Sequence, residues 1–252
     1  MRSSNVRRVA ARPRGHAPLG ALLVLAFACL AGPADAGFGA PPDWSADVAP
    51  AQRYGGLDRD RCLAELTARG VPYTLVEEAR GVLAPLRLTG PLHGVTFHST
   101  VPAKNRDSSP WEIVDCRLAL ALDDFAAQLH EHDIVDVVHY SIYRPPSKDW
   151  PVDRVASQHV GALAIDAASF TKSDGTKLDV EHDFHGRIGA TTCGPGTGPE
   201  PATSEALELR DIVCDAAQAK LFNVALTPDY NWAHRNHFHL EVAAGMRWFV
   251  VH

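Results

Sequence analysis

Strand-like apolar segments alternate irregularly with helical segments along the 252 residues, and this order restricts the fold more than any other feature. The clearest strand is 134–143, which is rich in Val, Ile and Tyr and stops at Arg144-Pro145-Pro146, because proline cannot donate to a ladder. Periodicity predicts further strands at 95–97, 162–170, 176–181 and 237–242, and helices at 59–70, 116–129 and 203–222. No regular βαβ repeat joins them. The sequence therefore predicts a single α+β domain with a mostly antiparallel central sheet flanked by helices.

The N-terminus resembles an export signal. Five arginines precede the apolar run from Leu19 to Leu30, and Ala34-Asp35-Ala36 follows it. This order of basic, apolar and small residues predicts a signal peptide over 1–36, with cleavage after Ala36. The apolar run is short for a membrane span, so we expect no stable span after cleavage; a retained anchor is the alternative. Residues 37–57, rich in Gly, Pro and Ala, are predicted as a flexible leader before a folded domain over 58–252.

Charge and compartment restrict the partners. Removal of residues 1–36 takes away five of the 24 basic residues and one of the 30 acidic ones, which leaves a net charge of −10. A nucleic-acid ligand needs a concentrated basic face, and none is visible, so nucleic acid is excluded as a partner. Export predicts a secreted or periplasmic protein, and the sequence does not determine its oligomeric state.

Four cysteines remain in the exported part, namely Cys62, Cys116, Cys193 and Cys214. An even number in an exported chain favours two disulfides. No CxxC spacing occurs, which argues against a thiolate zinc site. Three pairings are possible; Cys62–Cys116 with Cys193–Cys214 is preferred only because each joins neighbouring segments.

Two polar clusters lie next to apolar strands. The first is Ser157-Gln158-His159-Val160-Gly161-Ala162-Leu163-Ala164-Ile165-Asp166, and the second is His234-Arg235-Asn236-His237-Phe238-His239. Side chains alternate along a strand, so His237 and His239 point to the same face, and His234 reaches them from the preceding loop.

These residues are the types that hold catalytic zinc. Such a site uses three nitrogen or oxygen ligands and leaves a position for water. His159, Asp166 and one histidine of the second cluster would supply that set. Zinc would acidify the water and polarise a scissile carbonyl, and a nearby histidine would transfer the proton. The alternative is that these histidines are solvated or structural groups beside a buried strand.

The two clusters resemble the LAS metallopeptidase superfamily, which includes lysostaphin-type endopeptidases and D-alanyl-D-alanine carboxypeptidases. More specifically, over about residues 58–243 the chain resembles the bacterial extensin-like C-terminal family. That family's pattern is Ser-x-His-x-x-Gly-x-Ala-x-Asp, then Phe and Asp-Gly, then Pro-x-Tyr-Asn and His-x-x-His-Phe-His. Beyond the first cluster, the matching residues are Phe170, Asp174-Gly175, Pro228-Asp229-Tyr230-Asn231, His234, His237 and His239.

The resemblance implies a LAS-like fold and a role for each residue of the clusters. His159, Asp166 and His239 correspond to the zinc ligands. His237 corresponds to the histidine that assists catalysis, and His234 completes an H-x-x-H-x-H pattern similar to that of murein endopeptidases.

Other roles come from neighbouring segments. Arg144 matches an arginine that lies beside the substrate carbonyl, where a guanidinium stabilises a developing oxyanion; a surface cation is its alternative role. Ser141 and Ser157 are expected to hydrogen-bond the ligands or the substrate. The chain departs from the carboxypeptidase branch at Asn236, where that branch has a glutamate, so proton transfer is expected to fall to His237 or His234.

The sequence thus predicts a secreted zinc hydrolase of amide bonds, with peptidoglycan stem peptides or cross-links as the substrate. One alternative is a non-catalytic, metal-containing module that binds the cell wall. The other is a domain that zinc only stabilises.

Overall fold

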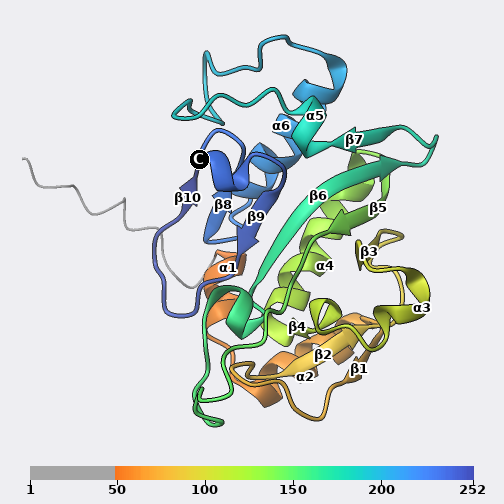
Figure 1. Ribbon diagram of the computed structural model, residues 1–252, viewed down its shortest axis with the longest axis vertical. Coiled ribbons are helices and arrows are strands. Elements are labelled where there is room, and N and C mark those ends of the chain that lie inside the picture. The colour runs from red at the N-terminus through yellow and green to blue at the C-terminus, as the bar shows by residue number, and fades with distance from the viewer. Residues whose placement is uncertain (1–48) are drawn as a thin grey trace, which may run out of the picture. The chain divides into compact units, whose positions relative to one another are not determined.

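The computed structural model describes residues 49–252 (Figure 1). The predicted signal peptide, its cleavage site and the first part of the predicted leader lie outside the described residues. The last part of that leader is folded, contrary to the prediction of a flexible segment up to residue 57. Helix α1 (Pro50–Gly55) begins on a proline, which suits the first turn because that position needs no N–H donor. Its Tyr54 is fully buried and accepts a hydrogen bond from Arg69, which ties this segment to the domain.

The longer helices begin at side-chain caps. Asp58, Asp115 and Thr203 each accept a backbone N–H of the first turn of α2, α4 and α6 respectively, which satisfies a donor that has no partner within the helix. These helices are α2 (Arg59–Arg69), α4 (Cys116–Glu131) and α6 (Ser204–Gln218). The shorter ones are α3 (Ala103–Arg106), α5 (Val180–Asp183) and the 3₁₀ turns η1 (Pro110–Glu112), η2 (Gln158–Gly161) and η3 (Trp232–His234).

Two sheets are present in the described part of the chain. The small one has the order β1 (Tyr73–Leu75), β2 (Pro85–Leu88), β4 (Val114–Asp115). The large one has the order β10 (Val250–Val251), β8 (Val224–Leu226), β9 (Phe238–Glu241), β6 (Ala164–Lys172), β5 (Ile134–His139), β3 (Thr96–Ser99), and β7 (Lys177–Asp179) also pairs with β6. Only the outer pairs β3–β5 and β8–β10 are parallel. The predicted α+β class with a mostly antiparallel sheet is therefore confirmed.

The long strand β6 organises the large sheet. One edge of β6 pairs with β5, while the other edge pairs first with β9 and then with β7. Helices α4 and α6 lie behind this sheet in Figure 1. The buried face of α4, which includes Leu118, Leu122 and Phe125, belongs to one hydrophobic core with Val137 of β5 and Phe170 of β6. Burial of this apolar surface supplies most of the driving force for folding.

Several boundaries differ from the predictions. Strand β5 ends at His139 rather than at 143, because its pairing with β6 shifts register at Val138 and His139. Residues 103–112, for which neither a helix nor a strand was predicted, contain α3 and η1. Strands β1, β2, β4, β8 and β10 were not predicted; each has two to four residues, too few to show a periodicity.

The cysteines pair as Cys62–Cys116 and Cys193–Cys214, which confirms the preferred pairing. The first disulfide joins α2 to the beginning of α4, and the second joins the loop before α6 to that helix. Across residues 49–252, no helix has the length and apolar character that crossing a bilayer requires.

Candidate metal centre

Three separate elements bring His159, Asp166 and His239 together. His159 lies in η2, Asp166 in the central strand β6, and His239 in β9. The antiparallel register pairs Asp166 directly with His239 across the two strands. Cross-strand partners have their side chains on one face of the sheet, so this register alone places the carboxylate beside the imidazole. The turn η2 precedes β6 and returns His159 to the same place.

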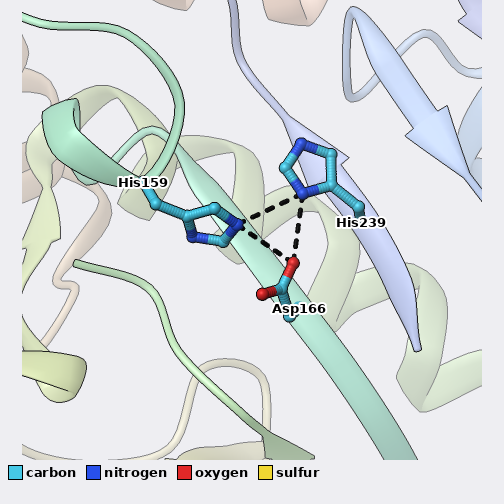
Figure 2. A group of neighbouring side chains, drawn as sticks. All are labelled: His159, Asp166 and His239. Atoms are coloured by element: carbon cyan, nitrogen blue, oxygen red, sulfur yellow. Dashed lines mark hydrogen bonds and ion pairs between the residues drawn. The ribbon is translucent and has the colours of Figure 1, made fainter. Parts of the chain in front are cut away.

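The three side chains converge on one point (Figure 2). The distance from His159 Nε2 to Asp166 Oδ1 is 3.0 Å, and that from His239 Nδ1 to the same oxygen is 3.1 Å. The two imidazole nitrogens are 3.3 Å apart. All three side chains are buried, and Asp166 is only 1% exposed. Among the described residues, this is the one group of three or more histidine, cysteine or acidic side chains with metal-binding spacing.

Contacts on the far side of each ring decide which nitrogen faces the centre. His159 Nδ1 lies 2.9 Å from the carbonyl oxygen of Ile142, which can only accept, so this nitrogen donates and Nε2 faces the centre. His239 Nε2 lies 3.6 Å from a carboxylate oxygen of the buried Glu241. An imidazole that contacts a carbonyl or carboxylate in this way is the usual arrangement of a metal-binding histidine.

The other oxygen of Asp166 is held by the protein. Arg144 Nη2 donates to Asp166 Oδ2, and Ser141 Oγ donates to it over 3.3 Å. Arg144 Nε also donates to Ser141 Oγ over 2.9 Å. Oδ2 is therefore fully engaged, and Oδ1 is the oxygen directed at the histidines. The structure thus joins Arg144 and Ser141 to a candidate ligand; Ser141 is buried, which does not support the predicted contact between its side chain and a substrate.

His237 also approaches Asp166. Its Nε2 lies 3.4 Å from Asp166 Oδ1, while its Nδ1 lies 2.9 Å from Asn236 Oδ1. Since an amide oxygen accepts, Nδ1 carries the proton and Nε2 carries a lone pair. His234 is farther out: its ring centroid is 5.3 Å from that of His237 and 5.8 Å from that of His239, and its Nδ1 contacts Asn231.

The cluster has the electrostatics of a cation site. Burial alone would raise the pKa of Asp166, but its contacts with His159 and His239 lower it far below its usual range. Burial alone would lower the pKa of His239, but Asp166 and Glu241 raise it to about 9. Burial lowers the pKa of His237 to about 4 and also lowers the pKa of His234, so both are neutral at pH 7. The raised pKa keeps a proton on His239 at neutral pH, and a divalent ion bound by His239 and Asp166 would replace that proton.

The remaining predicted site residue, Ser157, is the N-cap of η2 and is exposed, and its side chain makes no capping hydrogen bond. It is not part of the buried cluster. Sequence reasoning did not place Glu241 or the Ile142 carbonyl at the site. The spacing of two between His237, His239 and Glu241 was a usable signal for Glu241, because alternate residues of a strand share a face. A backbone carbonyl leaves no such signal.

A family model described as "Extensin-like protein C-terminus" matches residues 61–250. The chain belongs to the extensin-like C-terminal family. None of the curated proteins and none of the solved structures compared with it gives a match. In this extensin-like domain, Ala162 stands at the glycine position of the Ser-x-His-x-x-Gly-x-Ala-x-Asp pattern, and it adopts the left-handed conformation (φ 52°) that glycine takes without strain. Asn236 contacts both His237 and the hydroxyl of Tyr140.

Proposed function

We propose that this extensin-like domain is a secreted zinc hydrolase that cleaves amide bonds in peptidoglycan stem peptides or cross-links. The observation that carries the proposal is the convergence of two imidazole nitrogens and one carboxylate oxygen within 4.8 Å of one another, in a buried cluster. A structural zinc site is usually closed by four protein ligands, whereas a catalytic site has three and leaves a position for water. The group of three favours the catalytic type.

The donor set fits zinc. Two imidazoles and one carboxylate are ligands that zinc accepts, and His159 already presents the nitrogen that is free to bind. Zinc in such a site lowers the pKa of a water ligand to roughly 7 and polarises a carbonyl. The native metal is part of the proposal, and a soft ion is disfavoured because both disulfides remove cysteine thiolates from the described domain.

The chain's own groups supply the proton transfer. His237 is neutral and presents the lone pair of Nε2 toward the cluster, so it can accept a proton from an attacking water and later donate it to the leaving amine. Arg144 and Ser141 keep Asp166 oriented so that Oδ1 is directed at the histidines.

Peptidoglycan is the substrate that fits the predicted compartment. Two disulfides are typical of proteins that fold in an oxidising environment, which agrees with the predicted export. The resemblance of the two clusters to the LAS superfamily points to the same polymer. We infer that the substrate bond is an amide within the peptide part of the polymer.

The proposal is tested by zinc content and murein digestion. Wild type is compared with His159→Ala, which removes a ligand, and with His237→Ala, which removes the proton acceptor. We expect His159→Ala to lose both zinc and cleavage, and His237→Ala to keep zinc but lose cleavage by a factor of about 10² or more. His182→Ala is the matched control, because His182 is exposed and pairs with Asp179 of β7 rather than with a candidate ligand.

Two results would contradict the proposal. A wild type that holds no metal after reconstitution with zinc would remove the metal centre. A wild type that holds zinc and leaves murein and isolated stem peptides intact would instead favour the non-catalytic, metal-containing module.

A further inference from the structure

A groove lies beside η3, the turn that also carries His234. It has a volume of about 370 Å³, and we call it the Trp232 groove. The residues that define it here are Glu181, His185, Ile188, Pro228, Trp232 and Arg235. Trp232 and His234 are the first and last residues of η3, so the same short turn contributes one residue to the groove and one to the histidine cluster. A ligand in the groove would therefore contact the turn that also carries His234.

The groove carries one charge of each sign. Glu181 Oε1 and Arg235 Nε are 3.9 Å apart, and both side chains are partly exposed. Within residues 49–252, neither side chain forms an ion pair with any other residue. An exposed pair at this separation contributes little to stability, because water screens it and two long side chains must be ordered to form it. Both charges are thus available to a ligand at small cost to the fold.

Apolar side chains stand beside this pair. Trp232 is 69% exposed and Ile188 is 58% exposed, and both line the groove together with Pro228. The guanidinium of Arg235 stacks on the Trp232 ring, with its carbon 4.5 Å from the ring centroid, and Nη1 donates to the Trp232 carbonyl. The stacking holds the cation at the edge of an apolar wall. The groove therefore combines an apolar surface with an adjacent carboxylate and guanidinium.

We propose that the Trp232 groove binds the zwitterionic end of an amino acid with an aliphatic side chain. The ligand's ammonium pairs with Glu181, its carboxylate pairs with Arg235, and its aliphatic part lies against Trp232 and Ile188. An ammonium and a carboxylate on one carbon match a neighbouring acid and base, and charge-assisted hydrogen bonds of this kind are the stronger ones. The inference rests on the proposed function, since it names the group of the substrate that the groove holds, an amino-acid end whose amine and carboxyl are both outside the peptide bonds.

A glycan is the competing occupant, because an exposed indole also stacks on sugar rings. The groove favours the zwitterion because its ammonium and carboxylate offer Glu181 and Arg235 closer partners than the 3.9 Å that separates the two side chains, whereas a neutral sugar offers a charged partner to neither.

The test uses metal-free full-length protein, so that an amino acid cannot bind through zinc. The indole N–H signal of Trp232, assigned with Trp232→Phe, is followed by NMR during titration with D- and L-norleucine. N-acetylnorleucine lacks the ammonium and norleucinamide lacks the carboxylate, so each tests one charge. We expect at least one enantiomer of norleucine to bind about tenfold or more tightly than either blocked derivative.

Variants separate the two charges. Glu181→Gln should weaken norleucine binding about tenfold or more and remove the difference between norleucine and norleucine blocked at its amine. Arg235→Gln should also weaken norleucine binding about tenfold or more, and it should remove the difference in affinity between norleucine and norleucinamide. Lys177→Gln is the control, because it breaks the nearby pair of Lys177 with Asp179 without lining the groove. Far-ultraviolet circular dichroism of each variant checks that it folds.

Three outcomes would overturn the inference: equal binding of norleucine and its blocked derivatives, no shift of the Trp232 signal with any of them, or a shift with N-acetylglucosamine oligomers alone. His159→Ala keeps the groove, so it should bind norleucine as the wild type does. If the protein binds norleucine but does not cleave murein, only the proposed function is contradicted. If it cleaves murein but does not bind norleucine, only the proposed role of the Trp232 groove is contradicted.

Discussion

At the scale of single residues, Asp166 is shared between two sets of partners. Its Oδ1 is directed at the histidines and its Oδ2 is held by Arg144 and Ser141. We expect Arg144→Gln to weaken zinc binding about 10- to 100-fold, because contacts of this kind orient a ligand and their loss typically costs that much. Competition with a chelator of known zinc affinity measures the change.

The control for Arg144 is Arg154→Gln. Arg154 stacks on Trp150 and contacts none of the candidate ligands, so zinc affinity should not change. Arg144→Lys should recover part of the loss, because an ammonium restores the charge but not the paired contacts with Ser141 and Asp166. Wild-type zinc affinity in Arg144→Gln would show that Arg144 does not position Asp166.

The raised pKa of His239 makes zinc binding dependent on pH. In the metal-free protein this pKa is about 9, above the value of about 6.5 for an unfolded chain, so His239 is protonated at neutral pH. Its protonation stabilises the metal-free fold fully below pH 6.5, and that contribution is lost as the pH rises through 9. Zinc must displace this proton, so zinc affinity should rise up to about tenfold per pH unit between pH 6.5 and 9.

Chelator competition at several pH values measures this slope. Calorimetry in two buffers of different ionisation enthalpy counts the protons released, and we expect one proton per zinc at pH 7.5. A zinc affinity that is flat between about pH 7 and 8.5, with no proton released, would contradict this assignment of the proton to His239.

At the scale of elements, the beginning of α4 depends on one buried carboxylate. Asp115 caps α4, pairs with the buried Arg117, and accepts the backbone N–H of Leu83 over 3.0 Å. Asp115→Ala removes the cap and leaves Arg117 buried without a counter-charge. We expect a loss of about 3–5 kcal/mol in the free energy of unfolding, measured by urea titration followed by circular dichroism.

Asp58→Ala is the matched comparison, because Asp58 caps α2 from an exposed position. Its loss should cost only about 1 kcal/mol, the usual value for a helix cap. Equal losses in the two variants would show that the buried pair adds nothing beyond the cap.

At the scale of the whole molecule, the two disulfides close loops of different length. Cys62 and Cys116 are 54 residues apart, and Cys193 and Cys214 are 21 residues apart. In the chain-entropy model, replacing each pair by alanines should cost about 4 and about 3 kcal/mol, respectively. Chemical denaturation of the two double variants measures both values. A larger loss from the Cys193–Cys214 pair would contradict the entropic account and indicate that local packing dominates.

The parts of the fold that were predicted are those with long periodic signals. The face of α4 that carries Leu118, Leu122 and Phe125, and the apolar run of β6, were readable because each repeats over several residues. Strands β8 and β10 were missed because two or three residues carry no period. The folded state of Tyr54 was missed because its partner Arg69 lies in a different helix.

For the candidate site, the sequence alone identified the residue types and their local geometry. The block from Ser157 to Asp166 named two of the three ligand-type residues, and the period of a strand placed His237 and His239 on one face. These are short-range properties, which depend on spacing along one segment.

Only the tertiary structure decided which atoms meet. The register of β6 against β9 sets Asp166 opposite His239. Beyond the end of β5, the backbone N–H of Ile142 bonds to Trp111, and the Ile142 carbonyl accepts from His159. The same packing turned Arg144 toward Asp166 and put Glu241 beside His239. Such contacts join residues far apart in the chain and depend on strand register, which a local sequence pattern does not encode.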